Sequence, residues 1–391
     1  MKIQRTLFLS LIVLIASLAE AQIPCTPAIM PPATLSVNWS QFFYDSAHTG
    51  CNPYESILST ATVGNLTLKW SSSFGDGLHS SPAVANGVLY VATDGNQGYV
   101  IAFNATTGQQ LWSTLVGGGI LGSPAVANGL VYVGTQLGNL AAISANTGEL
   151  IWNYWTGEQI IASPTVANGV VYIGSYDHYL YALNAATGAL KWKYAIGTVV
   201  YASVAVANGV VYAGIDDHNV YALDANTGTL LWQFTTGNYV ETSPAVANGI
   251  VYIASDDNNV YALNAHTGAQ IWKFPTPGGF PSAVAISRGV VYFAAGQDLY
   301  ALNGSTGKIV WDHYIDYGGA GSPVVANGVL YVQLGFDMNH QDQDGLYALD
   351  ANTGNILWEY YKLDGFWSDS AAVANGMVYI GYVYAFGLPN Q

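Results

Sequence analysis

"YALDANTGTLLWQF", residues 221–234, decides the fold, because the chain repeats it at intervals of about forty residues. "YALNAATGALKWKY" begins at residue 181 and "YALNAHTGAQIWKF" begins at residue 261. In the quoted copy the Asp224 side chain can cap a turn that ends at Thr227-Gly228, where glycine tolerates a left-handed conformation. Apolar and β-branched residues on both sides indicate strands. The stretch therefore predicts two strands joined by a tight turn, repeated along the chain.

The tryptophan in each copy gives the length of the repeat. Successive tryptophans are 42, 40, 40, 40, 40, 39 and 47 residues apart. A period near forty with strand patterning is the size of one propeller blade. Residues 203–236 contain four expected strands, "SVAVA", "GVVYAGI", "NVYALD" and "TLLWQFT". We interpret the tryptophans as structural residues that dock one blade on the next: Trp70, Trp112, Trp152, Trp192, Trp232, Trp272, Trp311 and Trp358.

The two ends of the repeat predict eight blades and a closed ring. The small-residue innermost strand occurs eight times, and so does the tryptophan strand. The first tryptophan strand, "LTLKWSSSF" around Trp70, has no blade ahead of it, and the last repeat stops without one. Joining the two completes a blade and removes an open edge. We therefore predict an all-β, eight-bladed β-propeller of four-stranded antiparallel blades over residues 62–391, closed by the strand around Trp70.

The N-terminal residues predict export. Residues 1–21 combine a basic start, an apolar core and the small-x-small sequence Ala19-Glu20-Ala21, which is typical of a cleaved signal peptide. A retained anchor helix is the alternative, and a lipoprotein is not expected because Pro24 precedes Cys25. In the segment 22–61 an even cysteine count predicts a disulfide between Cys25 and Cys51, worth about 3–4 kcal/mol. We expect a periplasmic or extracellular protein with no membrane span.

Charge excludes one class of partner. The formal net charge is −15, and it becomes −16 without residues 1–21. Binding to nucleic acid needs a cluster of cations, and only seven lysines and arginines remain, scattered along the chain. We expect no nucleic-acid partner.

The repeat also carries a family resemblance. The pattern Ala182-x-Asn184-x-x-Thr187-Gly188-x-x-x-Trp192 resembles the tryptophan-docking repeat of eight-bladed propellers of the pyrroloquinoline-quinone (PQQ) type. Residues 38–70 are similar to the N-terminal segment of quinoprotein alcohol dehydrogenases, with these residues in similar order: Trp39, Asp45, Asn52-Pro53, Val63, Leu66 and Trp70. The resemblance covers nearly the whole mature chain. It implies the fold, whereas function differs within the family, which includes both dehydrogenases and a non-enzymatic propeller lipoprotein of outer-membrane barrel assembly.

The turns predict two unlike faces. Alternate turns of an antiparallel blade fall at opposite ends, so the recurrent Ala-Asn-Gly and Thr-Gly turns share one end, here called the uniform face. The other end, the variable face, holds the turns between second and third strands and the crossings between blades, where the copies differ. A ligand or partner site is expected there, although unconstrained loops would vary in the same way. The candidate residues ring the mouth of the central channel: His79, Tyr201, Tyr239, Glu241, Phe280, Phe366, Trp367 and Asp369.

Two groups of acidic residues resemble metal sites in part. Asp177-His178, Asp216-Asp217-His218 and Asp256-Asp257 occupy equivalent turns of successive blades, too far apart for a shared ion, and are interpreted as solvated turn residues. Asp342 and Asp344 have calcium-like spacing in the 337–345 insertion, but the loop lacks its first Asp and its twelfth-position Glu. No metal site is therefore predicted, and these two remain a weak candidate.

The features of a quinoprotein active site are missing from the sequence. There is no adjacent cysteine pair, no long catalytic insertion and no Cys-x-x-Cys-His haem motif. We expect no catalytic residue and no cofactor, and an exported propeller that is a binding or assembly scaffold for an envelope or extracellular protein, or for a glycan. A PQQ-dependent alcohol or sugar dehydrogenase, with PQQ and calcium, is the first alternative, and a carbohydrate-binding propeller is the second. The chain is expected to be a monomer.

Overall fold

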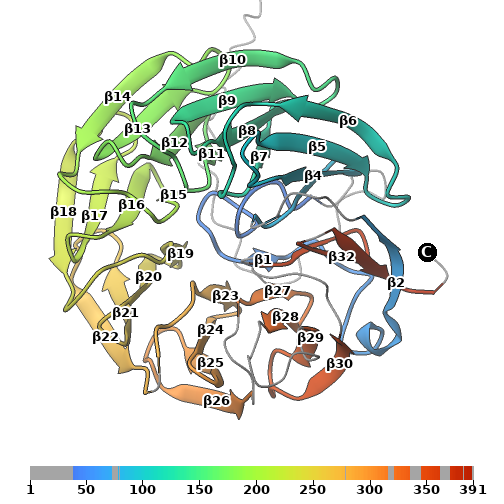
Figure 1. The fold of residues 1–391 in the computed structure, drawn as a ribbon. Helices are drawn as coiled ribbons and strands as arrows, with labels where there is room; N and C mark the ends of the chain where they lie inside the picture. Colours follow the sequence, from blue (N-terminus) through green and yellow to red (C-terminus); the bar gives the residue numbers. More distant parts are fainter. Residues whose placement is uncertain are drawn as a thin grey trace, which may run out of the picture.

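The structure is a computed structural model, and it describes residues 38–72, 78, 80–277, 279–315, 321–334, 345–361, 370–381 and 383–389. Eight β-sheets stand around a central axis like the blades of a propeller (Figure 1). Each is a four-stranded antiparallel sheet, and one gains a short fifth strand at the axis. The predicted fold class is confirmed.

The blades are numbered here in chain order, and their strands run from the axis outward. Blade 1 contains β3 (Ala83–Ala85), β4 (Val88–Ala92), β5 (Tyr99–Asn104) and β6 (Gln110–Leu115), and blade 2 contains β7 (Ala125–Ala127), β8 (Leu130–Gly134), β9 (Asn139–Ser144) and β10 (Leu150–Trp155). Blade 3 contains β11 (Thr165–Ala167), β12 (Val170–Gly174), β13 (Tyr179–Asn184) and β14 (Leu190–Ala195), and blade 4 contains β15 (Ala205–Ala207), β16 (Val210–Ile215), β17 (Asn219–Asp224) and β18 (Leu230–Thr235). Blade 5 contains β19 (Ala245–Ala247), β20 (Ile250–Ser255), β21 (Asn259–Asn264) and β22 (Gln270–Pro275), and blade 6 contains β23 (Ala285–Ser287), β24 (Val290–Ala295), β25 (Asp298–Asn303) and β26 (Ile309–Tyr314). Blade 7 contains β27 (Val324–Ala326), β28 (Val329–Leu334), β29 (Gly345–Asp350) and β30 (Ile356–Tyr361), and blade 8 contains β31 (Ala372–Ala374), β32 (Met377–Ile380), β33 (Tyr384–Gly387) and β2 (Thr67–Ser71).

Blade 8 closes the ring with strands from both ends of the chain. Strand β2 pairs antiparallel with β33, in a register that sets Thr67 opposite Gly387 and Ser71 opposite Tyr384. Strand β2 contains Trp70 and is the outermost strand of this sheet. The predicted closure is therefore confirmed.

Each tryptophan strand docks on the following blade through its indole. The Trp192 indole N–H donates to the backbone carbonyl of Ala225, 3.0 Å away in the next blade. The ring also lies on the Thr-Gly turn there, since a Cβ built on Gly228 would be 2.7 Å from it. Position 228 therefore favours glycine for two reasons: its φ is +71°, and a side chain there would clash with the indole. The other indoles make the equivalent bond: Trp70 to Ala105, Trp112 to Ala145, Trp152 to Ala185, Trp232 to Ala265, Trp272 to Gly304, Trp311 to Ala351 and Trp358 to Leu66.

The uniform face exists as expected. Within a blade the Thr-Gly turn hydrogen-bonds to the Asn-Gly turn, as Ala225 N–H does to the carbonyl of Gly209. The turn asparagines adopt positive φ, for example +50° at Asn208. The variable face lies at the opposite ends of the same strands.

No described helix is long and apolar enough to cross a membrane. The one helix among the described residues is the 3-10 turn η1 (Val63–Asn65), which precedes β2.

Candidate functional site

The centre of the ring is filled by the chain's own N-terminal segment, residues 39–52, here called the plug. Figure 1 shows it in blue at the axis, where it includes β1 (Cys51–Asn52). No sequence pattern indicated this position, and residues 22–61 were expected only to be an N-terminal segment with a disulfide. The plug touches the innermost strand of every blade in turn, through hydrogen bonds of Trp39 with Val84, Ser40 with Val126, Gln41 with Val166, Ser46 with Val206, Ala47 with Val246, Thr49 with Ile286, Gly50 with Val325 and Asn52 with Val373.

Those hydrogen bonds explain why the plug lies there. The innermost strand of each blade has a free edge, and an unpaired buried N–H is costly. In blades 1 to 7 the N–H of the central residue of that strand donates to an oxygen of the plug. Seven edges are thus satisfied by one short stretch of chain, while in blade 8 the Asn52 side chain donates to the Val373 carbonyl instead.

The interior of the plug is aromatic and holds two ionisable groups, His48, which is buried, and Asp45, which is partly buried. Phe42 packs edge-on against His48, with ring centroids 5.5 Å apart. His48 shares a 3.0 Å hydrogen bond between Nε2 and the Thr165 hydroxyl, and burial lowers its pKa to about 3, offset in part by the Pro244 backbone. The Asp45 carboxylate accepts hydrogen bonds from the Thr49 N–H and hydroxyl, yet burial raises its pKa to about 6. Desolvation in the plug therefore disfavours the charged form of both groups.

Residues 53–66, here called the strap, leave the axis over the uniform face. The Asn327 side-chain amide donates to the Leu58 carbonyl, and the Gly376 N–H donates to Glu55. Both partners are turn residues of that face, in blades 7 and 8. The expectation that the uniform face is alike in every blade is therefore wrong there, because the strap covers two of its turns.

A belt of serines links the blades at the start of the innermost strands. Each serine N–H donates to the hydroxyl of the serine in the next blade, as Ser123 does to Ser163 at 2.8 Å. The belt continues through these pairs: Ser370 to Ser81, Ser81 to Ser123, Ser163 to Ser203 and Ser203 to Ser243. It ends where Ala283 occupies the equivalent position in blade 6.

Half of the predicted mouth residues can be placed. His79, Phe366, Trp367 and Asp369 lie outside the described residues, as do Cys25 and the weak metal candidates Asp342 and Asp344. The disulfide with Cys51 therefore stays a prediction. Tyr201, Tyr239, Glu241 and Phe280 are all exposed, and Phe280 is the most exposed at 68 %.

Three of these lie in one cluster over blades 3 to 5, here called the mouth patch. Tyr201 packs edge-on against Tyr176, with ring centroids 5.0 Å apart, and Tyr239 packs against His218 at 5.1 Å. Glu241 lies close enough to Asp216 and Asp256 to interact electrostatically with both. The patch thus combines aromatic rings with carboxylates: Tyr176, Tyr201, Asp216, His218, Tyr239, Glu241 and Asp256.

The carboxylates of the mouth patch repel one another. Burial raises the pKa of Asp216 to about 7, and the charges of Glu241, Asp256 and Asp217 contribute to this rise. Burial also raises the pKa of Glu241, with a contribution from Asp256. One Asp216 oxygen is buried, and no described residue makes a hydrogen bond to it. Positive charge placed here would relieve the repulsion.

The second aspartate of each turn has a different role. Asp177, Asp217 and Asp257 each accept a hydrogen bond from the tyrosine four residues later in the same blade. These hydrogen bonds tie each turn to the strand that follows it. Among the described residues no group of three His, Cys, Asp or Glu side chains could hold a metal ion.

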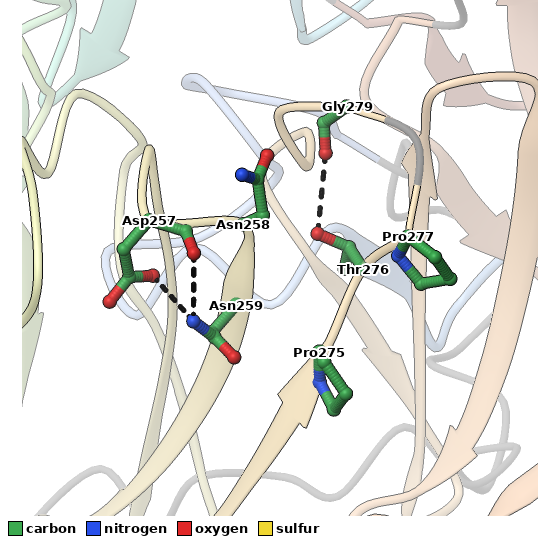
Figure 2. A pocket seen from close by; sticks show the side chains of 7 residues that line it. All are labelled: Asp257, Asn258, Asn259, Pro275, Thr276, Pro277 and Gly279. Carbon is green, nitrogen blue, oxygen red and sulfur yellow. Dashed lines mark hydrogen bonds between the residues drawn. The ribbon is translucent and has the colours of Figure 1, made fainter.

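Beside the patch is a cleft of about 610 Å³ between blade 5 and the crossing to blade 6 (Figure 2). One wall is polar, formed by Asp257, Asn258 and Asn259. The opposite wall carries the rings of Pro275 and Pro277. Sequence reasoning missed this cleft, as it missed Tyr176, and it did not connect Asp216 and Asp256 with the mouth.

Fold and repeat together define an eight-bladed propeller of the PQQ-like type. A family model described as outer membrane protein assembly factor BamB matches residues 64–154, 96–199, 195–279 and 268–382. The chain belongs to this family of PQQ-like repeat propellers. No curated protein matches the chain by sequence.

Solved structures show how widely this fold is used. Quinohemoprotein alcohol dehydrogenase ADHIIG from Pseudomonas putida HK5 superimposes with a TM-score of 0.76 at 16 % identity, covering 95 % of this chain and 83 % of that one. BamB from Moraxella catarrhalis gives 0.68 at 19 % identity, covering 83 % and 98 %. The computationally designed protein Ika8 gives 0.72 at 15 % identity, covering 82 % and 100 %. Similarity at this level establishes the fold alone.

The described residues of the mouth do not fit PQQ. That cofactor is a polycarboxylate and needs cationic groups or a metal ion around it. The mouth patch instead presents Asp216, Glu241 and Asp256, which already repel one another, and it contains no lysine or arginine. A quinone that carries carboxylates would add to this repulsion.

Proposed function

We propose that this protein is an exported, non-catalytic scaffold of the cell envelope or extracellular space, which binds a partner through its variable face. The mouth patch is the observation that carries the proposal. It combines exposed aromatic rings with clustered carboxylates at the place where the blades differ most. Membership of a family that includes assembly factors is compatible with this role.

The chemistry of the patch favours a partner that carries cationic side chains. A lysine or arginine inserted between Glu241 and Asp216 would offset their repulsion. Tyr201 and Tyr239 are 37 % and 46 % exposed, so each ring is available to contact a cation. Aromatic residues and desolvated charge pairs are typical of the energetic centre of a protein interface.

Octa-arginine, labelled with a fluorophore, tests this preference by fluorescence anisotropy at low and physiological salt. We expect binding that weakens with salt and falls at least tenfold when Asp216→Asn and Glu241→Gln are combined. Glu149→Gln is the matched control, since it removes one carboxylate from the uniform face and should leave binding unchanged. Equal binding by the double variant and the wild type would overturn the proposal.

The non-catalytic part of the proposal has a separate test. The full chain is incubated with PQQ, calcium, an artificial dye acceptor, and alcohols or sugars. We expect no quinone-dependent dye reduction above a control without protein. Turnover that depends on both PQQ and substrate would make the protein a dehydrogenase.

A further inference from the structure

One exchange between repeats distinguishes the outer strand pair of blade 5, beside the cleft, from that of blade 4. At the end of the outer two strands, blade 4 pairs Asn219 with Thr235, and blade 5 pairs Asn259 with Pro275. In blade 4 the Thr235 hydroxyl donates to Asn219 Oδ1 at 2.6 Å. Proline has no hydroxyl, so blade 5 lacks this donor.

The exchange leaves one acceptor open toward the cleft. Asn259 Nδ2 donates to the backbone and the side chain of Asp257, at 2.9 and 3.0 Å. Those bonds fix the amide, and its oxygen points away from Asp257 toward Pro275 (Figure 2). No donor among the described residues reaches that oxygen, whereas in blade 2 the equivalent Asn139 receives one from Asn153 at 3.3 Å.

The carboxylate that lines the cleft, Asp257, already has hydrogen-bond donors around it. Burial raises the pKa of Asp257, but hydrogen bonds from Tyr261, Asn259 and the Gly237 N–H outweigh burial and hold the pKa below its usual value. The lining contains no lysine or arginine. Asp257, the charged residue of this lining, is thus already hydrogen-bonded, and a neutral ligand can bind beside it without leaving its charge unpartnered.

The other wall offers flat apolar surface. Pro275 and Pro277 are exposed on either side of Thr276, which is buried and donates its hydroxyl to the Gly279 carbonyl. Phe280, with most of its ring in solvent, follows at once in the sequence. A volume of about 610 Å³ is within the range of small-molecule sites, which combine apolar walls with a few fixed polar groups.

We propose that this cleft binds a neutral sugar residue, whose hydroxyl donates to Asn259 Oδ1 and whose C–H face packs on the rings of Pro275 and Pro277. The exposed Asn258 amide provides a second polar contact with both donor and acceptor capacity. This inference goes beyond the proposed partner binding and does not depend on it, because the two sites use different residues.

Saturation-transfer NMR on the full chain tests the site, with maltose, cellobiose and diacetylchitobiose as probes at millimolar concentration. Pro275→Thr installs the hydroxyl that blade 4 has, and we expect it to occupy Asn259 Oδ1 and lower affinity at least tenfold. Pro275→Val has the shape of threonine without the hydroxyl and loses the same proline ring, so it is the matched reference, and it should bind the sugar at least tenfold more tightly than the threonine variant. Thermal unfolding confirms that both variants are folded.

The comparison of those two variants decides the outcome. Saturation transfer that is lost with threonine and kept with valine supports the open acceptor as the binding group. Equal affinity of the two variants overturns the proposal, whether both bind or neither does. Absence of transfer to all three sugars in the wild type also overturns it. Octa-arginine binding in the same variants shows whether the mouth patch is unaffected.

Discussion

Trp358 donates its indole N–H to the backbone carbonyl of Leu66 at 3.1 Å, across 292 positions of the sequence. This bond joins blade 7 to the segment that leads into β2, and so it belongs to the closure of the ring. It is the same contact that the other seven tryptophans make with the blade that follows them. Closure therefore uses the ordinary blade-to-blade contact, supplied by the opposite end of the chain.

Trp358→Ala should destabilise the protein by about 3–5 kcal/mol, the usual cost of removing a large buried aromatic side chain. The indole is only partly exposed and packs edge-on against Phe386, with ring centroids 5.3 Å apart. Chemical denaturation measures the change in unfolding free energy. Trp155→Ala is the control, because that side chain is 62 % exposed and should cost less than about 0.5 kcal/mol. Similar losses for the two variants would contradict the docking role of Trp358.

Gly228→Ala should cost more stability than Gly209→Ala, although both glycines have positive φ. A methyl group at position 209 meets no atom within 4 Å, so that variant measures the left-handed backbone alone, about 1 kcal/mol. At position 228 the methyl group would also lie 2.7 Å from the Trp192 ring, which adds about 1–3 kcal/mol of overpacking. Thermal and denaturant unfolding measure the difference. Equal losses of unfolding free energy in the two variants would show that the Trp192 ring moves aside without strain.

Asp45 and His48 should have opposite effects on stability in acid. The folded-state pKa of Asp45 is raised to about 6, so its contribution to stability is present at low pH and is lost as the pH rises through 6. The folded-state pKa of His48 is lowered to about 3, so between about 3 and 6.5 the unfolded state binds the extra proton and stability falls on acidification. Between about pH 4 and 6 the two contributions offset each other in the wild type.

Asp45→Asn removes one of these contributions and should expose the other. The variant should lose stability on acidification from pH 6 to 4 more steeply than the wild type, by up to about 1.4 kcal/mol per pH unit. Denaturant unfolding at four or five pH values measures the slopes. His48→Gln is the complementary control and should change the slope in the opposite direction. A slope for Asp45→Asn that matches the wild type would show that Asp45 does not titrate in this range.

The fold could be predicted from the sequence because one residue pattern recurs with one period. Trp192 and Gly228 contact each other in space, and seven of the eight docking tryptophans lie on an equivalent glycine, Trp358 being the exception, so the repeat itself encodes the docking. Closure was also predictable, because the tryptophan strand around Trp70 and the incomplete last repeat are complementary. Blade number and topology followed from these two facts.

The plug could not be predicted in the same way. Ser40, Ala47 and Gly50 contact the blades through their backbone carbonyls, which every residue possesses, so no side-chain pattern records the contact. Phe43 and His48 adopt positive φ without being glycine, at +52° and +54°, and give no turn signal. Only the similarity of residues 38–70 to a family segment marked this region.

Part of the candidate site could have been predicted from the sequence. Asp217 and Tyr221 are four residues apart, and the same spacing at 177–181 and 257–261 could have separated structural aspartates from those of the mouth. Comparing Thr235 with Pro275 in aligned repeats would also have shown the missing hydroxyl of blade 5. That Tyr176 meets Tyr201 depends on how neighbouring crossings fold over the face, and no repeat encodes this.

Glu241→Gln should lower the pKa of Asp216 from its value of about 7. Burial is the largest cause of the raised pKa and will remain, but the Glu241 charge is the next largest and will be removed. Carbon-detected NMR titration of the aspartate carboxyl groups measures the change directly. Asp216 will then be ionised over more of the neutral range, so the pH at which octa-arginine binding reaches half its maximum should shift downward with it. Glu149→Gln, distant on the uniform face, should leave both values unchanged. If the Asp216 pKa is the same in both variants, the carboxylates do not interact, and the mouth patch loses the electrostatic reason for preferring a cationic partner.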